Sequence, residues 1–330
     1  MKRRSTQGFT LIELMISVVL GLVVIGGVVS VLLANKRSYS TNEGLGQIQE
    51  SARTAFELMA RDIRQAGANG CDNNNRVGNV IAAGGQWWST WYGVTGIDGA
   101  ATDPAVADGT TAGLRVAGTD SIHVQSVQGV SVPVQLHNAT ATTMRFAALT
   151  PFVVGDVLVA CDVDHSTMFR ATAVTTVTPF TVTHAATGSN CSSGLGFPTV
   201  CDSGAGTLHP FPINSQVSRV TASAWYIGNN ERAGESGRSL YRVRLNNGGV
   251  EVTEEIVSGV TDMQLRYGLN GSQDIIEADD AAMDWARVNS VFVTLLIDSA
   301  DANVSTDPTE NSGRIQRPFN YLITLRNRVP

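Results

Sequence analysis

The feature that most constrains this chain is an apolar run near its N-terminus. The run from Phe9 to Ala34 contains a single charged side chain, Glu13, and it follows the basic residues Lys2, Arg3 and Arg4. As a helix rising about 1.5 Å per residue it would be roughly 39 Å long, enough to cross a hydrocarbon core of about 30 Å. We therefore predict one membrane-spanning helix, and the basic residues favour a cytoplasmic N-terminus.

Glu13 is the residue of this run that hydropathy does not explain. A carboxylate in the middle of a bilayer costs about 2.5 to 3.5 kcal/mol on insertion scales, so it needs a partner. The nearest basic side chains in the sequence are Arg4 and Lys36. A cut after Gly8 would create an α-amine on Phe9, and the amine of a neighbouring copy would serve as well as the chain's own. The alternative is a carboxylic acid kept protonated by desolvation.

The residues around Glu13 carry a family resemblance. The octapeptide GFTLIELM at 8–15 resembles the class III signal of type IV pilins and type II secretion pseudopilins. LMARDIRQAG at 58–67 with Cys71, and LRNR at 325–328, are similar to PilW-type minor pilins. Unlike many major pilins, the apolar run contains no proline.

The resemblance implies a processing route and a function. A prepilin peptidase would cut between Gly8 and Phe9, the same class of enzyme would N-methylate Phe9, and Glu13 would neutralise the amine of an adjacent subunit. The expected function is that of a minor pilin taking part in the initiation of pilus assembly, located at or near the tip. The alternatives are a minor pseudopilin of a type II secretion system and a pilus-borne surface adhesin.

Partners and location follow from the same resemblance. Besides the prepilin peptidase/N-methyltransferase, the implied partners are other minor pilins, the major pilin and a large tip-associated adhesin. The chain would be a single-pass inner-membrane protein with its globular domain in the periplasm, and after assembly it would lie in the pilus at the cell surface.

Helical periodicity continues beyond the apolar run. Apolar side chains recur at three- and four-residue spacing as far as Ala66, which predicts an amphipathic helix that lies against a globular domain. Gly67 and Gly70 are expected to end it. The predicted organisation is a leader peptide (1–8), a transmembrane and assembly helix (9–34), its amphipathic continuation (35–66) and a β-rich periplasmic or extracellular pilin domain (67–330). The stripe consists of Ile48, Ala52, Ala55, Phe56, Met59, Ile63 and Ala66.

The rest of the chain reads as loops and short strands. Residues 67–118 are rich in Gly, Asn, Ala and Thr and predict little regular structure. Short Val- and Thr-rich segments follow, in two sets divided by a loop at 188–212, and they indicate an antiparallel β region. We therefore predict an α+β fold, in which a long spine helix packs on an antiparallel sheet, as in pilins, with an enlarged β-rich region. The predicted strands are 121–127, 130–136, 142–147, 153–161, 168–177 and 179–183, then 217–227, 240–245, 250–257, 263–267, 288–297 and 321–326.

Two strand predictions are more specific. Segments 240–245 and 250–252 flank Asn246-Asn247-Gly248-Gly249 and predict a hairpin. Segment 288–297 is largely apolar, which suits a central strand covered on both faces, one of them by the spine helix.

The four cysteines all lie beyond the apolar run. In an oxidising periplasm they predict two disulfides, with three possible connectivities. A Gly- and Pro-containing loop between Cys191 and Cys201 favours that pair, which leaves Cys71 with Cys161. Zinc ligation would need closer spacings such as C-x₂-C, so no metal or other cofactor is expected.

The aromatic cluster at 87–92 allows two interpretations. Trp87, Trp88, Trp91 and Tyr92 could form a surface that docks protein or stacks on carbohydrate. Large apolar anchors are also what a loop-rich region needs in its core, and we favour the core interpretation.

The sequence contains no recognisable catalytic or nucleic-acid-binding site. The five histidines are scattered, and no G-x-S-x-G, H-E-x-x-H or Walker-type motif occurs, so the chain is not expected to be an enzyme. The formal charge of −6 argues against general binding of nucleic acids. Acidic pairs at Asp162/Asp164 and Asp279/Asp280 lack the Gly-and-Glu pattern of an EF-hand loop, so solvated turns are favoured over calcium sites.

Overall fold

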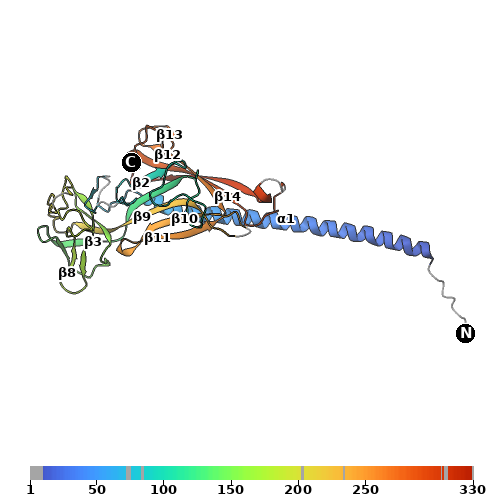
Figure 1. Ribbon diagram of the computed structural model, residues 1–330, viewed down its shortest axis with the longest axis horizontal. Coiled ribbons are helices and arrows are strands. Elements are labelled where there is room, and N and C mark those ends of the chain that lie inside the picture. Colours follow the sequence, from blue (N-terminus) through green and yellow to red (C-terminus); the bar gives the residue numbers. More distant parts are fainter. Residues whose placement is uncertain are drawn as a thin grey trace.

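A long helix dominates the shape of the molecule. The computed structural model describes residues 10–71, 76–82, 85–201, 204–232, 235–305, 307 and 311–328. The helix α1 (Leu11–Gln65) projects from the folded domain over its N-terminal half, and its C-terminal half lies against the strands (Figure 1). Residues 1–9, which include the predicted leader peptide and Phe9, lie outside the described residues.

The second half of α1 is held by the apolar stripe that its sequence predicts. Phe56 is half-buried and stacks on Tyr321, with 4.2 Å between the ring centroids. The helix ends at Gln65, and Gly67 follows with a positive φ of 80°, a backbone conformation that favours glycine. The buried residues of α1 are Gly44, Ile48, Ala52, Ala55, Met59, Ala60 and Ile63.

The strands within the described residues form two sheets, of which the larger has eleven strands. Its main path runs β1-β6-β5-β9-β3-β4-β8-β7, with β10 and β11 beside β9 and β2 beside β3. All of its pairs are antiparallel except β1 with β6. Its strands are β1 (Gly78–Asn79), β2 (Val94–Ile97), β3 (Ser121–Asn138), β4 (Thr143–Phe146), β5 (Val157–Cys161), β6 (Ser166–Arg170), β7 (Ala173–Thr175), β8 (Phe180–Thr183), β9 (Gln216–Asn229), β10 (Arg238–Leu245) and β11 (Glu251–Ser258).

The smaller sheet packs directly on α1 through β14 and β15. It runs β13-β12-β14-β15 and is antiparallel throughout. The segment 288–297 does form a central strand, but only its inner face is buried; Phe292, Thr294 and Leu296 on the outer face are half-exposed. The strands are β12 (Val260–Leu269), β13 (Ile275–Ile276), β14 (Val288–Asp298) and β15 (Gln316–Thr324), and 3₁₀ turns occur at Asn247–Gly249, Trp285–Arg287 and Asn311–Gly313.

The structure corrects two predicted divisions of the chain and adds two short strands to a region predicted to have little regular structure. β3 is one strand where two were predicted, because Gly129, with a φ of +89°, lies in an irregularity of its ladder with β9 and not in a turn. The loop 188–212 does not separate two sets of strands, since β9 after it pairs with β3 and β5 before it. The region 67–118 is mostly irregular but includes β1 and β2.

The predicted hairpin is present as β10 and β11. The two strands pair antiparallel from Ser239↔Ser258 to Leu245↔Glu251. Gly248 and Gly249 take positive φ angles of 74° and 70° in the turn, which explains why this turn is built from glycines.

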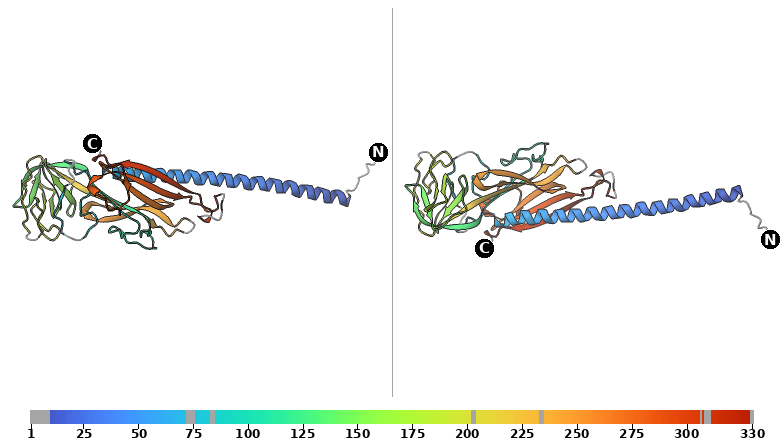
Figure 2. Two further views of the ribbon diagram at one scale, coloured as in Figure 1. Left: turned by 90° about the horizontal axis from the view of Figure 1, so that it is seen from above. Right: turned by 90° about the horizontal axis from the view of Figure 1, so that it is seen from below.

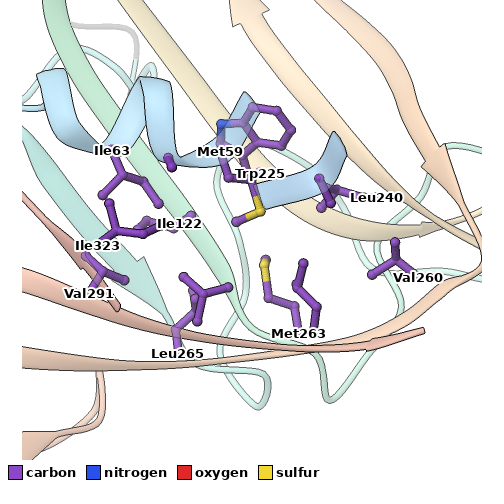
Figure 3. Packing of buried hydrophobic residues seen from close by; sticks show 14 of the residues in the cluster. Met59, Ile63, Ile122, Trp225, Leu240, Val260, Met263, Leu265, Val291 and Ile323 are labelled. Atoms are coloured by element: carbon purple, nitrogen blue, oxygen red, sulfur yellow. The ribbon is translucent and has the colours of Figure 1, made fainter. Parts of the chain in front are cut away.

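The main core lies between α1 and the two sheets. Met59 and Ile63 of α1 point toward Trp225 of β9 and Leu265 of β12 (Figure 3). The Trp225 indole N–H donates to a carboxylate oxygen of Asp62 at 3.1 Å, so the ring is buried without leaving its polar atom unpaired. This core fixes the second half of α1 in the domain and leaves the first half outside.

A distal lobe, residues 130–215, lies at the end of the molecule farthest from the N-terminus (Figures 1 and 2). It has a core of its own, which includes Met144, Phe146, Phe169 and Val182. β3 runs from the main domain into this lobe and so belongs to both parts.

Two disulfides stabilise the domain. Cys71 bonds to Cys161 and Cys191 bonds to Cys201, the connectivity that the loop sequence favours. The first bond joins the segment after α1 to β5, and the second closes a short loop inside the distal lobe.

Candidate assembly interface

The projecting half of α1 is an apolar surface that the rest of the chain does not cover. Its most apolar 18-residue window has a mean hydropathy of 2.8, and none of it is buried inside the molecule. The large apolar side chains between Leu11 and Leu33 are 47–76% exposed. An apolar surface of this extent requires lipid or other protein chains around it.

Glu13 is engaged by the residue that caps the helix. Its carboxylate accepts hydrogen bonds from the Thr10 backbone N–H at 3.0 Å and the Thr10 hydroxyl at 2.9 Å. The Glu13 backbone N–H donates in return to the Thr10 hydroxyl at 3.3 Å, which completes a capping box. The sequence interpretation considered only charged partners for Glu13 and missed the hydrogen bonds from Thr10.

The capping box does not neutralise Glu13, since both of its donors are uncharged. Within the part of the chain that the structure describes, no basic side chain pairs with this carboxylate. A cation for the ionised form of this carboxylate would therefore have to come from outside the described residues. Gly8 and Phe9, the predicted cleavage and methylation residues, lie outside the described residues, so these assignments remain predictions.

The other polar groups of the projecting half are satisfied by the helix itself. The Ser17 hydroxyl donates to the Glu13 carbonyl at 2.6 Å, and the Ser30 hydroxyl donates to the Gly27 carbonyl at 2.7 Å. Hydroxyls bonded in this way can lie in an apolar environment without an unmet donor. Gly21, with open space around its Cα, leaves room for another helix to approach closely.

The aromatic cluster at 87–92 is divided between the core and the surface. Trp88 is 1% exposed and Trp91 is 7% exposed, and both pack in a core with residues of β5, β6 and β9. The Trp88 indole N–H donates to Glu251 at 2.9 Å. Trp87 is half-buried and Tyr92 is well exposed, so the core interpretation holds for Trp88 and Trp91, and an interaction patch stays a prediction for the other two rings.

The polar clusters singled out in the sequence have structural roles. Asp162 accepts hydrogen bonds from the backbone N–H groups of Asp164 and His165, which makes it a turn residue, and it pairs with His209 at 2.7 Å. Among the described residues, no group of three or more His, Cys, Asp or Glu side chains is arranged to hold a metal ion.

Comparison with known proteins assigns both ends of the chain. Residues 224–327 match the family described as Type IV Pilus-assembly protein W, and residues 3–29 match the prokaryotic N-terminal methylation motif. No curated protein matches.

Two solved structures are similar over most of the chain. One is a chain of the GspK-GspI-GspJ complex of the enterotoxigenic Escherichia coli type 2 secretion system, with 9% identity, coverage of 85% of this chain and 98% of that one, and a TM-score of 0.31. The other is the type IV-like pilin TTHA1219 from Thermus thermophilus, with 8% identity, coverage of 86% and 98%, and a TM-score of 0.31.

An apolar projecting helix with a methylation motif, joined to a domain wrapped around the second half of that helix, defines a membrane-anchored protein of the type IV pilin-like class. Its last third carries the PilW domain, which places the chain with the minor pilins and pseudopilins. Proteins of this family are structural components and not enzymes.

Proposed function

We propose that this protein is a minor pilin of a type IV pilus that takes part in initiating assembly and sits at or near the tip. The observation that carries the proposal is the uncovered apolar half of α1, with Glu13 near its start, in a chain whose other end carries the PilW domain. The large two-part β domain supports a terminal position, because it is bulky for a repeating subunit.

Assembly would draw on two kinds of interaction in the projecting half of α1. Packing between helices of neighbouring subunits supplies affinity, since it removes the exposed apolar side chains from their surroundings. The Glu13 carboxylate would pair with the Phe9 α-amine of an adjacent subunit and so set the register of the helices. A charge left unmatched in such a bundle is costly, which penalises wrong registers.

Processing and location belong to the same proposal. A prepilin peptidase would cut after Gly8 and methylate Phe9. The chain would wait in the inner membrane with its domain in the periplasm and then enter the pilus. Its partners would be other minor pilins, the major pilin and a tip-associated adhesin.

Replacing Glu13 tests the register mechanism. Glu13→Ala should still be cleaved but should be recovered in sheared filaments at least tenfold less than the wild type, because the amine of the neighbour loses its counter-charge. Quantitative mass spectrometry of sheared filaments measures both cleavage and incorporation. Glu50→Ala, which removes an exposed carboxylate from the polar face of α1, is the matched control and should assemble normally.

Two further outcomes bear on the proposal. Gly8→Ala should abolish cleavage, so a mature N-terminus at Phe9 in that variant would contradict the processing step. If deletion of the gene stops exoprotein export and leaves piliation intact, the protein is a pseudopilin and the pilus assignment is wrong.

A further inference from the structure

A polar cleft lies between the buried half of α1 and the larger sheet. Its volume is about 260 Å³, below the roughly 300–1,000 Å³ of sites that enclose drug-sized ligands. Most of its walls come from the side of α1 near Asp62 and from β3, β9 and β10. The lining residues are Leu58, Arg61, Asp62, Val124, Ser126, Thr221, Ala222, Ser223, Arg242, Arg244 and Leu245.

Positive charge exceeds negative charge in this cleft. A guanidinium nitrogen of Arg242 lies 2.9 Å from a Glu254 carboxylate oxygen, and another lies 3.5 Å from an Asp62 carboxylate oxygen. The Arg244 Nε lies 2.9 Å from the second carboxylate oxygen of Glu254. The carboxylates of Asp62 and Glu254 thus form ion pairs with the guanidinium groups of Arg242 and Arg244. Arg61 is exposed and makes no ion pair with any residue that the structure describes. One cation in excess is notable because the whole chain is acidic, with a formal charge of −6.

Arg242 contacts an aromatic ring and two carboxylates, and one of its donors has no partner among the described residues. Its guanidinium stacks on the Trp225 ring, 5.1 Å from the centroid, while Asp62 accepts from the Trp225 indole N–H at 3.1 Å. The Arg242 Nε is buried and has no hydrogen-bond acceptor among the described residues. Buried polar groups in folded proteins nearly always have a partner, so this donor would pair with a water molecule or with an acceptor from another chain.

The shape and chemistry of the cleft select a carboxylate. Guanidinium groups bind planar carboxylates through paired N–H donors, and the hydroxyls of Ser126, Thr221 and Ser223 make the wall polar. The volume accommodates one side chain better than an extended ligand. A cleft beside α1 is also well placed for a neighbour whose own helix packs alongside.

We infer that this cleft receives an Asp or Glu side chain of a neighbouring pilin-type subunit, with Arg61 as its main charge partner. The inference rests on the proposed function, because it assumes that such subunits assemble side by side with this chain. It adds a second, extracytoplasmic point of recognition to the one at Glu13, on the folded domain instead of the membrane segment.

The test couples the two partners chemically. Full-length Arg61→Lys in membranes containing its partner subunits, treated with a carbodiimide, should form an amide between position 61 and an Asp or Glu of a pilin-type subunit, which peptide mass spectrometry identifies. Arg53→Lys is the control, because position 53 already faces Glu57 of its own helix at 2.8 Å and should couple only within the chain. Coupling of position 61 only to carboxylates of its own chain, or to nothing, overturns the inference.

Charge reversal supplies the functional readout. Full-length tagged Arg61→Glu should recover at least fivefold less of its partner pilins from solubilised membranes than Arg53→Glu, and Arg244→Gln should show a smaller loss. Intact disulfides on non-reducing gels establish that each variant is folded. Equal recovery for all three variants refutes the cleft inference. The proposed function fails separately, when deletion of the gene stops exoprotein export and leaves piliation intact.

Discussion

Single residues in the distal lobe show how burial sets charge. His137 and His184 face each other with their Nε2 atoms 3.0 Å apart. The Phe211 backbone N–H donates to His137 Nδ1 at 3.0 Å, so the proton of His137 is on Nε2 and is donated to His184. Burial lowers the pKa of His137 to about 4 and that of His184 to about 3. Both rings are therefore neutral in the folded lobe at pH 7.

This pair predicts that acid loosens the distal lobe. In the unfolded chain both histidines have a pKa of about 6.5, so below pH 6.5 they bind protons that the folded lobe does not bind. The contribution of the pair to the free energy of unfolding is therefore fully present above pH 6.5 and falls as the pH drops toward 4. For His184 alone the loss at pH 5 is about 2 kcal/mol. Hydrogen exchange should show weaker protection of β8 at pH 5 than at pH 7, with α1 residues 48–63 as the internal reference. Equal protection of β8 at both values would contradict the prediction.

At the scale of elements, the sequence pattern predicted correctly those features that depend only on residues close together in the chain. The three- and four-residue spacing from Ile48 to Ile63 predicted the buried face of α1, because a helix places those residues together by itself. The break predicted in β3 failed, since Gly129 suits a turn and an irregular ladder equally well, and pairing with β9 decides between them. The placement of β9 between β3 and β5 depends on contacts across the whole domain, which no local pattern reports.

Two glycines on opposite sides of α1 give a prediction at this scale. A Cβ at Gly46 would meet open space, whereas one at Gly44 would lie 3.4 Å from Ser299 Cβ and 3.6 Å from Val304 Cγ2. Gly46→Leu should stabilise the domain by about 1 kcal/mol through helix propensity. Gly44→Leu should destabilise it by about 1–3 kcal/mol through overpacking. Denaturant titration of the detergent-solubilised chain measures both, and a similar effect of the two substitutions would refute the assigned packing.

At the scale of the whole molecule, the two candidate interfaces differ in how far they could be predicted. Glu13 lies within the apolar segment itself, so this interface could be predicted from the sequence without knowing the fold. The cleft beside Arg61 brings together residues from α1, β3, β9 and β10, and its charge balance also depends on Glu254 of β11. Trp88 and Trp91 show the reverse case, in which a conspicuous cluster proved to be core once β5 and β9 covered it.

The two disulfides should contribute unequally to the stability of the whole domain. Their cysteines are 90 and 10 residues apart in sequence. Loop-closure entropy then predicts a loss of about 4.6 kcal/mol for Cys71→Ser with Cys161→Ser, against about 2.7 kcal/mol for Cys191→Ser with Cys201→Ser. Comparing the urea midpoints of the two double variants measures the difference. A larger effect from the shorter loop would show that strain or residual structure outweighs chain entropy.

The Cys71–Cys161 bond also determines how the molecule carries tension. The disulfide joins β5 to Cys71, six residues beyond the end of α1. A force applied to the chain after Cys161 therefore reaches the helix directly through this bond. The disulfide bypasses residues 72–160 and the hydrogen bonds between the strands in that segment. If such a subunit were pulled at its helix and at its distal end, the disulfide would keep these two parts connected even after hydrogen bonds between strands had broken.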